Sequence, residues 1–405
     1  MTWERVRLGD IATVVSGATP KTGVDEYWDG DIAWATPKDL SGLGRKYISE
    51  TESYITEKGY KSCSTILLPP NSVLLSSRAP IGHVAINAIP MATNQGFKSL
   101  IPKQGALDAS YLYHWLKSQT SYLNSLGRGA TFKEVSKTIV EDIEIPLPPL
   151  PVQQRIAAVL DEVDALRQKR ERSIEGLEAL RESAYIHHLA ESQASSVRVR
   201  VSDLIDPHRG GMRTGPFGSQ LLHSEFVDDP SGIMVLGIDN AVKNRFRYTG
   251  ERYITPEKYE GLRRYTVHPG DVLVTIMGTC GRVAIVPSNI PTAINTKHLC
   301  AMSLNEQCLP EYLHATLIYN PSVLKQMGAS ARGAIMDGLN MGIISALEFD
   351  LPEVSEQRKL QTVFAEIDSL TDAALHARQT EGVLLSSLQT RAFSGKLNLR
   401  ELTLS

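Results

Sequence analysis

The chain has 405 residues, of which 42% are hydrophobic and 21% are charged, and its formal net charge at pH 7 is −3. This is the composition of a globular protein with room for two or three domains, and it excludes a disordered or collagen-like chain. It also lacks the strong basic excess of most free-standing duplex-DNA binders. The opening Met1-Thr2-Trp3-Glu4-Arg5 has no apolar leader and no stretch could span a bilayer, so we expect a cytoplasmic protein.

The four cysteines have no C-x-x-C spacing and no nearby histidine pair, which predicts neither a zinc site nor a disulfide framework. They are Cys63, Cys280, Cys300 and Cys308. The phosphate loop G-x-x-x-x-G-K-[S/T], the turn G-x-G-x-x-G and the tetrapeptide N-P-P-[Y/F] are also missing. The sequence therefore predicts a chain that is not itself an enzyme. A catalytic cluster assembled by the fold without any motif is the alternative.

Short strands and turns alternate in residues 1–148, the first predicted domain. Residues 6–11 have the pattern of an entry strand or turn, and residues 16–21 form a loop of turn-favouring residues. Residues 72–76 and 82–86 have the pattern of a hairpin, and a helix is expected from Tyr111. The first domain is therefore predicted to be a mixed α/β globule.

A proline-rich segment then precedes a long amphipathic helix, predicted over residues 149–194. Proline is tolerated in the first turn of a helix, so Pro151 marks its start. Apolar residues follow at the a and d positions of a heptad repeat. They are Ile156, Val159, Val163, Leu166, Leu177 and Leu180. A narrow apolar stripe of this kind needs a partner helix.

The same order of features recurs in the second half of the chain. Gln153 and Gln357 match at an offset of 204 (357 − 153), and Gly82 and Gly281 match at an offset of 199 (281 − 82). Small steps in the offset are typical of two copies of one domain. A second globule is therefore predicted over residues 195–351, and a second helix with a C-terminal tail over residues 352–405. The heptad positions of this helix are Leu360, Val363, Ile367, Leu370, Ala374, Leu384 and Leu388.

These elements predict an α+β fold in which two similar mixed α/β globules are separated by a pair of long antiparallel coiled-coil helices. Each helix leaves a different globule, so the two can pair only in antiparallel fashion, and a pseudo-twofold axis relates the two halves. About 40 residues at 1.5 Å each give a spacer of roughly 60 Å. Two independent surface helices are the alternative arrangement.

Several segments together resemble a known protein family. They are Ser16-Gly17-x-Thr19-Pro20, Tyr27-Trp28-x-Gly30-x-Ile32-x-Trp34, Gly215-Pro216-Phe217-Gly218-Ser219, the doubled helix starts, and Ala392-Phe393-Ser394-Gly395. In this order they resemble the specificity (S) subunit of type I restriction-modification enzymes over nearly the whole chain. The second copy departs from the pattern, because it has Glu353 and Ser355 where the first has Pro149 and Pro151.

The resemblance implies a non-catalytic DNA-specificity subunit whose globules are target-recognition domains, each reading one half of a bipartite, asymmetric DNA target. It implies two modification (methyltransferase) subunits as partners, and restriction subunits joined through them. No cofactor is expected on this chain, whereas S-adenosylmethionine is expected in the methyltransferase subunits. A coiled-coil scaffold that does not read DNA, and an enzyme with an unrecognised site in one globule, are the alternative functions.

Basic and hydroxyl side chains in predicted loops are the candidates for DNA contact, because such groups clamp phosphates or read base edges. In the first globule they are Thr19, Lys21, Lys38, Arg78, Arg128 and Lys133. In the second globule they are Arg213, Ser219, Lys243, Arg245, Lys297 and Arg332. Arg128 and Arg332 stand in the same Arg-Gly-Ala turn of both copies. A solvated surface charge is the alternative interpretation of each basic residue.

Overall fold

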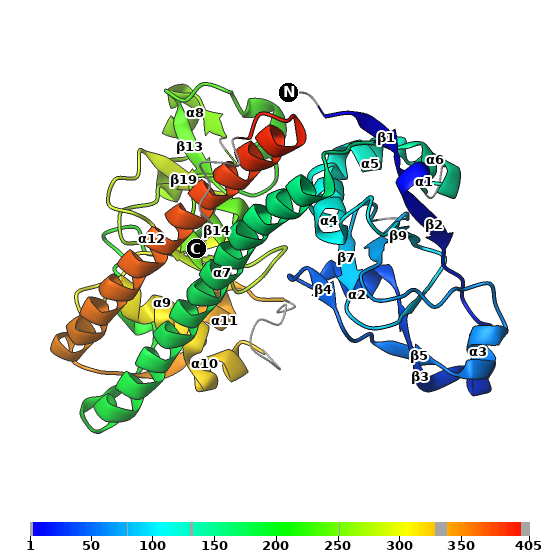
Figure 1. Ribbon diagram of the computed structural model, residues 1–405. Helices are drawn as coiled ribbons and strands as arrows, with labels where there is room; N and C mark the ends of the chain where they lie inside the picture. Colours follow the sequence, from blue (N-terminus) through cyan, green and yellow to red (C-terminus); the bar gives the residue numbers. More distant parts are fainter. Residues whose placement is uncertain (1–2, 79, 130–132, 251, 329–337, 398–405) are drawn as a thin grey trace. The chain divides into compact units, whose positions relative to one another are not determined.

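The computed structural model of the chain describes residues 3–78, 80–129, 133–250, 252–328 and 338–397. Backbone contacts group the chain into two compact units, residues 1–174 with 373–405, and residues 175–372. Two long helices, α7 (Leu150–Ser192) and α12 (Val354–Phe393), each contribute one segment to each unit (Figure 1). The sequence predicted four consecutive domains, whereas the compact units divide both helices.

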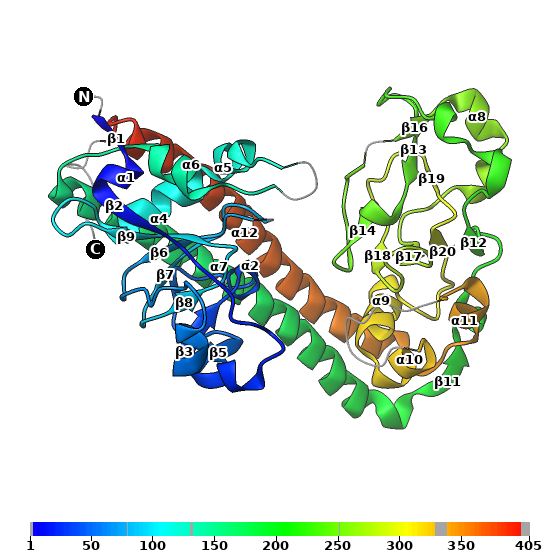
Figure 2. The same cartoon turned by 90° about the vertical axis from the view of Figure 1, so that its right-hand side faces the viewer.

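The first unit contains a five-stranded and a three-stranded sheet (Figure 2). The larger sheet has the order β2 (Ala12–Ser16), β9 (Lys98–Pro102), β6 (Val73–Leu75), β7 (Val84–Asn87) and β4 (Tyr47–Ile48). The smaller sheet has the order β5 (Ser53–Ile55), β3 (Trp28–Ala35) and β8 (Ala92–Thr93). Strands β6 and β7 form the hairpin that the sequence predicted.

Short helices complete the first globule. They are α1 (Leu8–Ile11), α2 (Pro37–Ser41), α3 (Glu57–Lys61), α4 (Ala109–Ser118), α5 (Thr120–Leu126), α6 (Lys137–Asp142) and the 3-10 turn η1 (Asp25–Tyr27). The Asp108 side chain caps α4 by accepting a hydrogen bond from Tyr111 N, which satisfies one free backbone donor. The apolar core around Tyr111 also contains Leu160 of α7 and Leu388 of α12, so both long helices complete this globule.

The second unit contains a four-stranded sheet, a three-stranded sheet and a two-stranded hairpin. The four-stranded sheet has the order β12 (Met212–Thr214), β20 (Leu299–Met302), β17 (Val272–Thr275) and β18 (Val283–Ile285). The three-stranded sheet has the order β16 (Tyr253–Ile254), β13 (Ile233–Leu236) and β19 (Ala293–Asn295). The hairpin joins β14 (Ala241–Val242) and β15 (Arg245–Phe246).

Short helices again surround these strands. They are α8 (Pro256–Glu260), α9 (Pro310–Tyr319), α10 (Pro321–Gln326) and α11 (Met341–Ala346), with 3-10 turns at η2 (Gln193–Ser195), η3 (Val201–Leu204), η4 (Gly218–Gln220), η5 (His223–Glu225), η6 (Ile238–Asn240) and η7 (Arg263–Tyr265). Tyr185 of α7 and Phe364 of α12 are fully buried in the core around Tyr312 of α9. Both long helices therefore complete this globule as well.

The two globules share the order of four strands in the larger sheet and of all three strands in the smaller sheet, which confirms the predicted fold class. In each, a parallel pair of strands, β3 with β8 and β13 with β19, forms part of the three-stranded sheet. The strand that opens each globule pairs with the strand that precedes the long helix, β1 (Arg5–Arg7) with β10 (Glu144–Pro146) and β11 (Val197–Arg200) with β21 (Glu348–Leu351). This pairing joins the two ends of each globule at the helix start.

Glycines are required where the first strand of each larger sheet ends. A Cβ at Gly17 would lie 2.0 Å from Asn94 O, and a Cβ at Gly215 would lie 1.9 Å from Asn295 O. No side chain fits at such a distance from a backbone oxygen. The two close approaches place the turn after β2 beside the end of β8, and the turn after β12 beside the end of β19.

The glutamines that revealed the repeat are buried clamps. Gln153 Oε1 accepts a hydrogen bond from Asp108 N (2.9 Å), while its Nε2 donates to Ala106 O (2.9 Å) and Pro148 O (2.8 Å). Gln357 makes the matching bonds to Leu309 N (2.8 Å), Gln307 O (2.9 Å) and Pro352 O (2.8 Å). Each glutamine ties the start of a long helix to the loop before α4 or α9, because buried backbone groups need partners.

The long helices run antiparallel in each unit. In the first unit Arg170 Nη2 lies 3.1 Å from Glu381 Oε1, and Arg378 Nη1 lies 2.9 Å from Glu171 Oε2. In the second unit Arg181 pairs with Asp368, and its guanidinium lies 4.1 Å from the centroid of the Phe364 ring.

The seam between the helices differs from the predicted heptad at five of its thirteen positions. Of the predicted residues, Ile156, Val159, Val163, Leu360, Ile367, Ala374 and Leu388 are buried and Leu177 is half-buried. The others, Leu166, Leu180, Val363, Leu370 and Leu384, are 42–58% exposed. At four of these places the next residue is buried instead, namely Arg181, Phe364, Thr371 and Leu385, and at the fifth the next residue, Arg167, is half-buried. A heptad spacing of three and four residues can be placed on either of two neighbouring residues. The prediction took the more apolar neighbour, which in these cases faces solvent. The stem of an arginine can pack into the seam in place of a leucine.

Candidate nucleic-acid interface

Three of the predicted DNA-contact residues of the first globule lie together. Isolated antiparallel bridges join Glu134 to both Arg78 and Arg128, and Lys133 precedes Glu134 in the chain. The side chains of Arg78, Arg128 and Lys133 are exposed. Arg78, Arg128 and Lys133 therefore form a single basic patch around Glu134.

Glu134 organises this basic patch. Its carboxylate lies 2.9 Å from Arg78 Nε and 3.0 Å from Lys98 Nζ, and only 8% of the Lys98 side chain is exposed. Burial alone would raise the pKa of Glu134, but the hydrogen bonds from Lys98 and Arg78 outweigh it and hold the pKa below its usual range. Four basic side chains and one carboxylate leave a local positive charge on a chain whose net charge is −3.

The remaining candidates of the first globule are Thr19, Lys21 and Lys38. Thr19 Oγ1 is hydrogen-bonded to Gln95 Oε1, which follows β8. Lys21 is exposed, and its carbonyl accepts a hydrogen bond from Trp28 Nε1 (3.3 Å). Lys38 Nζ lies 2.7 Å from Glu52 Oε2, and this hydrogen bond raises the pKa of Lys38. Lys21 thus presents an exposed ammonium group near the Gly17 turn, whereas Thr19 and Lys38 each already have a side-chain partner.

The matching turn of the second globule carries Ser219. Gly215 N donates to Thr296 O (3.3 Å), so the turn after β12 lies beside the end of β19, where Lys297 follows Thr296. Ser219 and Lys297 are both exposed. The structure thus places a polar turn beside a strand end in each globule, with different side chains in the two copies.

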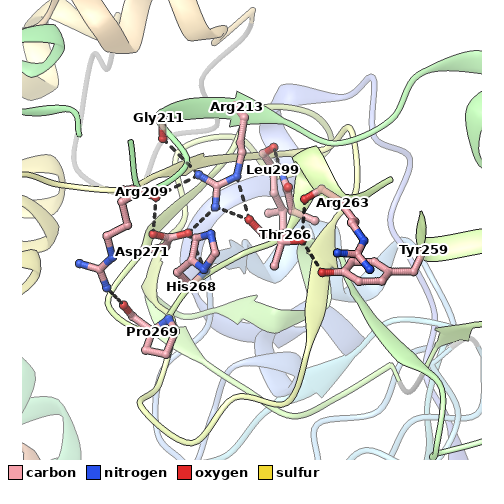
Figure 3. Close-up of polar contacts among 12 residues, drawn as sticks. Arg209, Gly211, Arg213, Tyr259, Arg263, Thr266, His268, Pro269, Asp271 and Leu299 are labelled. Atoms are coloured by element: carbon pink, nitrogen blue, oxygen red, sulfur yellow. Dashed lines mark hydrogen bonds and ion pairs between the residues drawn. The ribbon is translucent and has the colours of Figure 1, made fainter. Parts of the chain in front are cut away.

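Arg213 is buried, in contrast to its prediction as a DNA-contact residue (Figure 3). Its Nη1 donates to Gly211 O (3.1 Å) and Ser303 Oγ (3.1 Å), its Nε donates to Thr266 O (3.0 Å), and its Nη2 pairs with Asp271. Of these partners Ser303 and Asp271 are fully buried, whereas Gly211 and Thr266 are half-buried. The guanidinium holds three segments of the fold together. Nothing in the local sequence indicates that a basic residue beside a glycine turn points inward.

Two further basic candidates, Lys243 and Arg245, lie on the β14–β15 hairpin but have different surroundings. Lys243 and Asn244 have positive φ angles of 51° and 57°, as a two-residue hairpin turn requires, and Lys243 is exposed. Arg245 is only 22% exposed and lies near carboxylates of α7 and α12. Arg245 is therefore engaged within its unit. Arg332 lies outside the described residues.

Each unit also has an open groove between its globule and the C-terminal part of one long helix. The first groove has a volume of about 480 Å³ and the second about 390 Å³. The residues that line the two grooves correspond. Arg5 pairs with Pro146 across β1 and β10 in the first groove, and Arg198 pairs with Asp350 across β11 and β21 in the second. The helix residues that line the grooves match at an offset of 200. They are Ser386, Gln389 and Thr390 of α12 in the first groove, and Ile186, Leu189 and Ala190 of α7 in the second. The groove is thus duplicated, polar in the first unit and apolar in the second.

Within the described part of the chain, no group of three or more His, Cys, Asp or Glu side chains could hold a metal ion. Among the same residues, no helix is both long and apolar enough to cross a membrane.

Residues 1–178 match the family model described as the type I restriction modification DNA specificity domain. The MjaIX specificity subunit of a type I restriction enzyme from Methanocaldococcus jannaschii is 44% identical over 180 residues, which cover 44% of this chain but only 41% of that protein. The EcoR124I/EcoR124II specificity subunit from Escherichia coli is 32% identical over 166 residues, or 39% of this chain and 40% of that protein. The MjaVIII specificity subunit of M. jannaschii is 22% identical over 424 residues, covering 99% of this chain and 94% of that protein.

Two solved structures share the fold over nearly the full length. One belongs to a study of complex assembly and conformational transition of the type I R-M system, with a TM-score of 0.58, 17% identity and 98% coverage of both chains. The other is the type I restriction-modification S subunit from M. genitalium, with a TM-score of 0.56, 13% identity and 96% coverage of both chains. At these identities the likeness concerns the fold alone.

Proposed function

Because the chain belongs to the specificity subunits of type I restriction-modification enzymes, we propose that it reads a bipartite, asymmetric DNA target, one half-site with each globule. The observation that carries this proposal is the duplicated frame with unlike loops. The glutamine clamps and strand pairings repeat in both units. The polar turns, by contrast, carry Thr19 and Lys21 in one globule and Ser219 and Lys297 in the other. Equal frames with unequal reading loops fit two different half-sites.

The local basic patch supports DNA as the ligand despite the net negative charge. Arg78, Arg128 and Lys133 can neutralise phosphates, while Glu134 fixes the position of the Arg78 side chain. Phosphate contacts position a protein on the duplex, and neighbouring hydroxyl and basic side chains then reach base edges. The contact is local, so methyltransferase partners are expected to supply further phosphate contacts.

We assign the chemistry of modification to partner subunits. The duplicated frame supports two copies of one partner, because the glutamine clamps and the strand pairs at the helix starts recur in both units. Two methyltransferase subunits, each using S-adenosylmethionine, would occupy such a repeat, with restriction subunits joined through them. In this proposal the chain supplies target selection and scaffolding and carries no catalytic residue or cofactor of its own.

Methylome sequencing tests the proposed function directly. A host that lacks other modification systems expresses the chain together with its methyltransferase subunit, and methylated adenines are mapped. The expected motif has two different half-sites separated by a fixed gap of unspecified bases. A continuous or perfectly palindromic motif would contradict the proposal. Methylation by the chain without a partner would favour the alternative of an enzyme, and binding of partners without any DNA motif would favour a pure scaffold.

A further inference from the structure

Lys46 joins the first globule to α7. The residue lies directly before β4, and its carbonyl accepts a hydrogen bond from Ile86 N (2.9 Å), so its main chain is fixed at the edge of the larger sheet. Its Nζ lies 2.6 Å from Asp161 Oδ2 on α7 and 3.1 Å from Ser110 Oγ on α4. Only 16% of the Lys46 side chain is exposed, so salt screens this ion pair less than a surface pair.

Asp161 is held as a carboxylate by two partners. His114 Nε2 lies 2.7 Å from Asp161 Oδ1, and the His114 side chain is only 1% exposed. Burial would raise the pKa of Asp161, but the hydrogen bonds from His114 and Lys46 outweigh burial and lower the pKa. Both carboxylate oxygens of this α7 residue are thus occupied by groups of the globule.

Arg245 makes the corresponding connection in the second unit. Its Nη2 lies 3.1 Å from Asp368 Oδ1 on α12 and 3.3 Å from Glu178 Oε1 on α7, while its Nη1 lies 3.3 Å from Asp372 Oδ1. The side chain comes from the β14–β15 hairpin, whose Asn244 is fixed to the globule by hydrogen bonds with Val283 N (3.1 Å) and His314 Nε2 (2.9 Å). One guanidinium therefore links a globule strand to both long helices.

Lys46 and Arg245 occupy matching positions of the repeat, at the offset of 199 (245 − 46) that also relates Gly82 to Gly281. Each binds an aspartate on the long helix that begins at its own globule, Asp161 on α7 and Asp368 on α12. We infer that Lys46 and Arg245 are a matched pair of positioning residues that fix each globule on its helix segments and thereby restrict the gap between the half-sites that are read. This inference rests on the proposed function.

The physical reason is the geometry of duplex DNA. One added base pair moves a half-site by about 3.4 Å along the axis and turns it by about 34°. Two rigidly held globules cannot follow both changes, whereas a globule that pivots on its helix can absorb part of them. A misplacement of about 1 Å can cost a reaction on the order of a hundredfold, so rigid globules give strong gap selectivity.

Gap selectivity in the complete methyltransferase complex tests the inference. Duplexes carry the native half-sites with the native gap or with one base pair more or fewer, and methylation rates are compared. The variants Lys46→Met and Arg245→Met keep an apolar stem and remove the charge. Each is expected to lower the preference for the native gap by about tenfold or more, with both half-site sequences unchanged. Lys46→Arg and Arg245→Lys are expected to restore the preference.

The control variants remove ion pairs whose two partners both belong to one globule and do not involve a long helix. Lys58 pairs with Glu26 at 2.9 Å and Lys258 pairs with Glu225 at 2.6 Å, so Lys58→Met and Lys258→Met are expected to leave the gap preference unchanged. Unchanged selectivity in the Lys46 and Arg245 variants, an equal loss of methylation at every gap, or an altered half-site sequence would each overturn the inference while the proposed function stands. A native chain with no two-part motif would overturn the proposed function and this inference together.

Discussion

The loop before β6 in the first globule is held by a neutral amide, whereas the matching loop before β17 in the second globule is held by an ion pair. In the first, Asn87 in β7 donates from Nδ2 to Pro69 O (2.9 Å) and Leu68 O (3.3 Å), and its Oδ1 accepts from Ser72 N (2.8 Å). In the second, the loop before β17 is held by the ion pair of Arg213 and Asp271. Ser72 and Asp271 are equivalent, since each is followed by a strand of the larger sheet and its carbonyl accepts from Asn87 N or Val286 N.

The difference shows that the frame constrains hydrogen bonding more than residue identity. A buried loop needs partners for its carbonyl groups, and either a neutral amide or a guanidinium can provide them. The two solutions differ in their response to damage, however. A neutral network loses individual hydrogen bonds, whereas a buried ion pair that loses one partner leaves an uncompensated charge.

Arg213→Ala is the substitution with the largest expected effect. Asp271 is fully buried, and removal of Arg213 leaves its charge without a cationic partner, which costs about 3–5 kcal/mol in the free energy of unfolding. The matched change in the first globule, Asn87→Ala, is expected to cost only about 1–3 kcal/mol. Hydrogen exchange across a denaturant series measures the stability of each unit in the full-length chain.

A double variant sharpens the same contrast. Val15 is the first-globule equivalent of Arg213, two residues before Gly17 as Arg213 is before Gly215. Arg213→Val combined with Asp271→Ser therefore gives the second globule the residues of the first, and we expect it to recover more than half of the loss, because no buried charge remains. A double variant as unstable as Arg213→Ala would show that the guanidinium is required for its hydrogen bonds to Thr266 and Gly211.

The glutamine clamps are the opposite case, in which the two units are alike. Gln153→Leu and Gln357→Leu each remove the partners of one backbone N–H and two carbonyl groups at a buried helix start. Each is expected to lower the stability of its own unit by about 2–3 kcal/mol, and by a similar amount in the two units. The measurement is again hydrogen exchange resolved by unit.

The control for the clamp is the exposed neighbour Gln154, whose replacement by leucine is expected to change stability little. If Gln153→Leu and Gln357→Leu differ by more than the spread among such surface variants, the two helix starts are not equivalent, and the internal repeat is less symmetric than their hydrogen bonds indicate.

The repeat, the fold class and the hairpin of β6 and β7 were predictable because they depend on local patterns in the chain. A further local mark of the repeat is that Tyr54-Ile55-Thr56 recurs as Tyr253-Ile254-Thr255. The threonine of each tripeptide caps a short helix. The interior position of Arg213 and the pairing of Lys98 with Glu134 were not predictable. Both join segments distant in sequence, and a basic residue looks the same in a sequence whether it faces solvent or a buried carboxylate.

The helix seam lies between these extremes. Its period was predictable, but its phase depends on which residue of a neighbouring pair the globule and partner helix bury. Arg181 lies inward since Phe364 and Asp368 receive its guanidinium, and this leaves the adjacent Leu180 outward, 51% exposed. Side-chain polarity alone therefore assigns such a position to the wrong neighbour.

Acidification is expected to distinguish the two units by a smaller amount. His314 in α9 corresponds to Tyr113 in α4, at the offset of 201 that relates Tyr111 to Tyr312. Burial, together with the nearby charge of Arg181, lowers the pKa of His314 to about 4. Between pH 6.5 and 4 the unfolded chain therefore binds a proton that the folded chain does not, so stability falls as the pH falls through this window. From pH 7 to 5 the loss in the second unit is roughly 2 kcal/mol.

His314→Gln isolates this contribution, because an amide can still donate to Asn244 O but does not titrate in this range. Burial also lowers the pKa of His188 and His298 in the same unit, but both histidines are present in the native chain and in the variant. Hydrogen exchange at pH 7 and pH 5 should therefore show a shallower pH dependence for the second unit of the variant. The first unit, with Tyr113 at the matching place, should respond equally in both proteins. An identical pH dependence of the second unit in the two proteins would mean that His314 keeps its ordinary pKa, and that the hairpin carrying Arg245 is not held by a neutral imidazole.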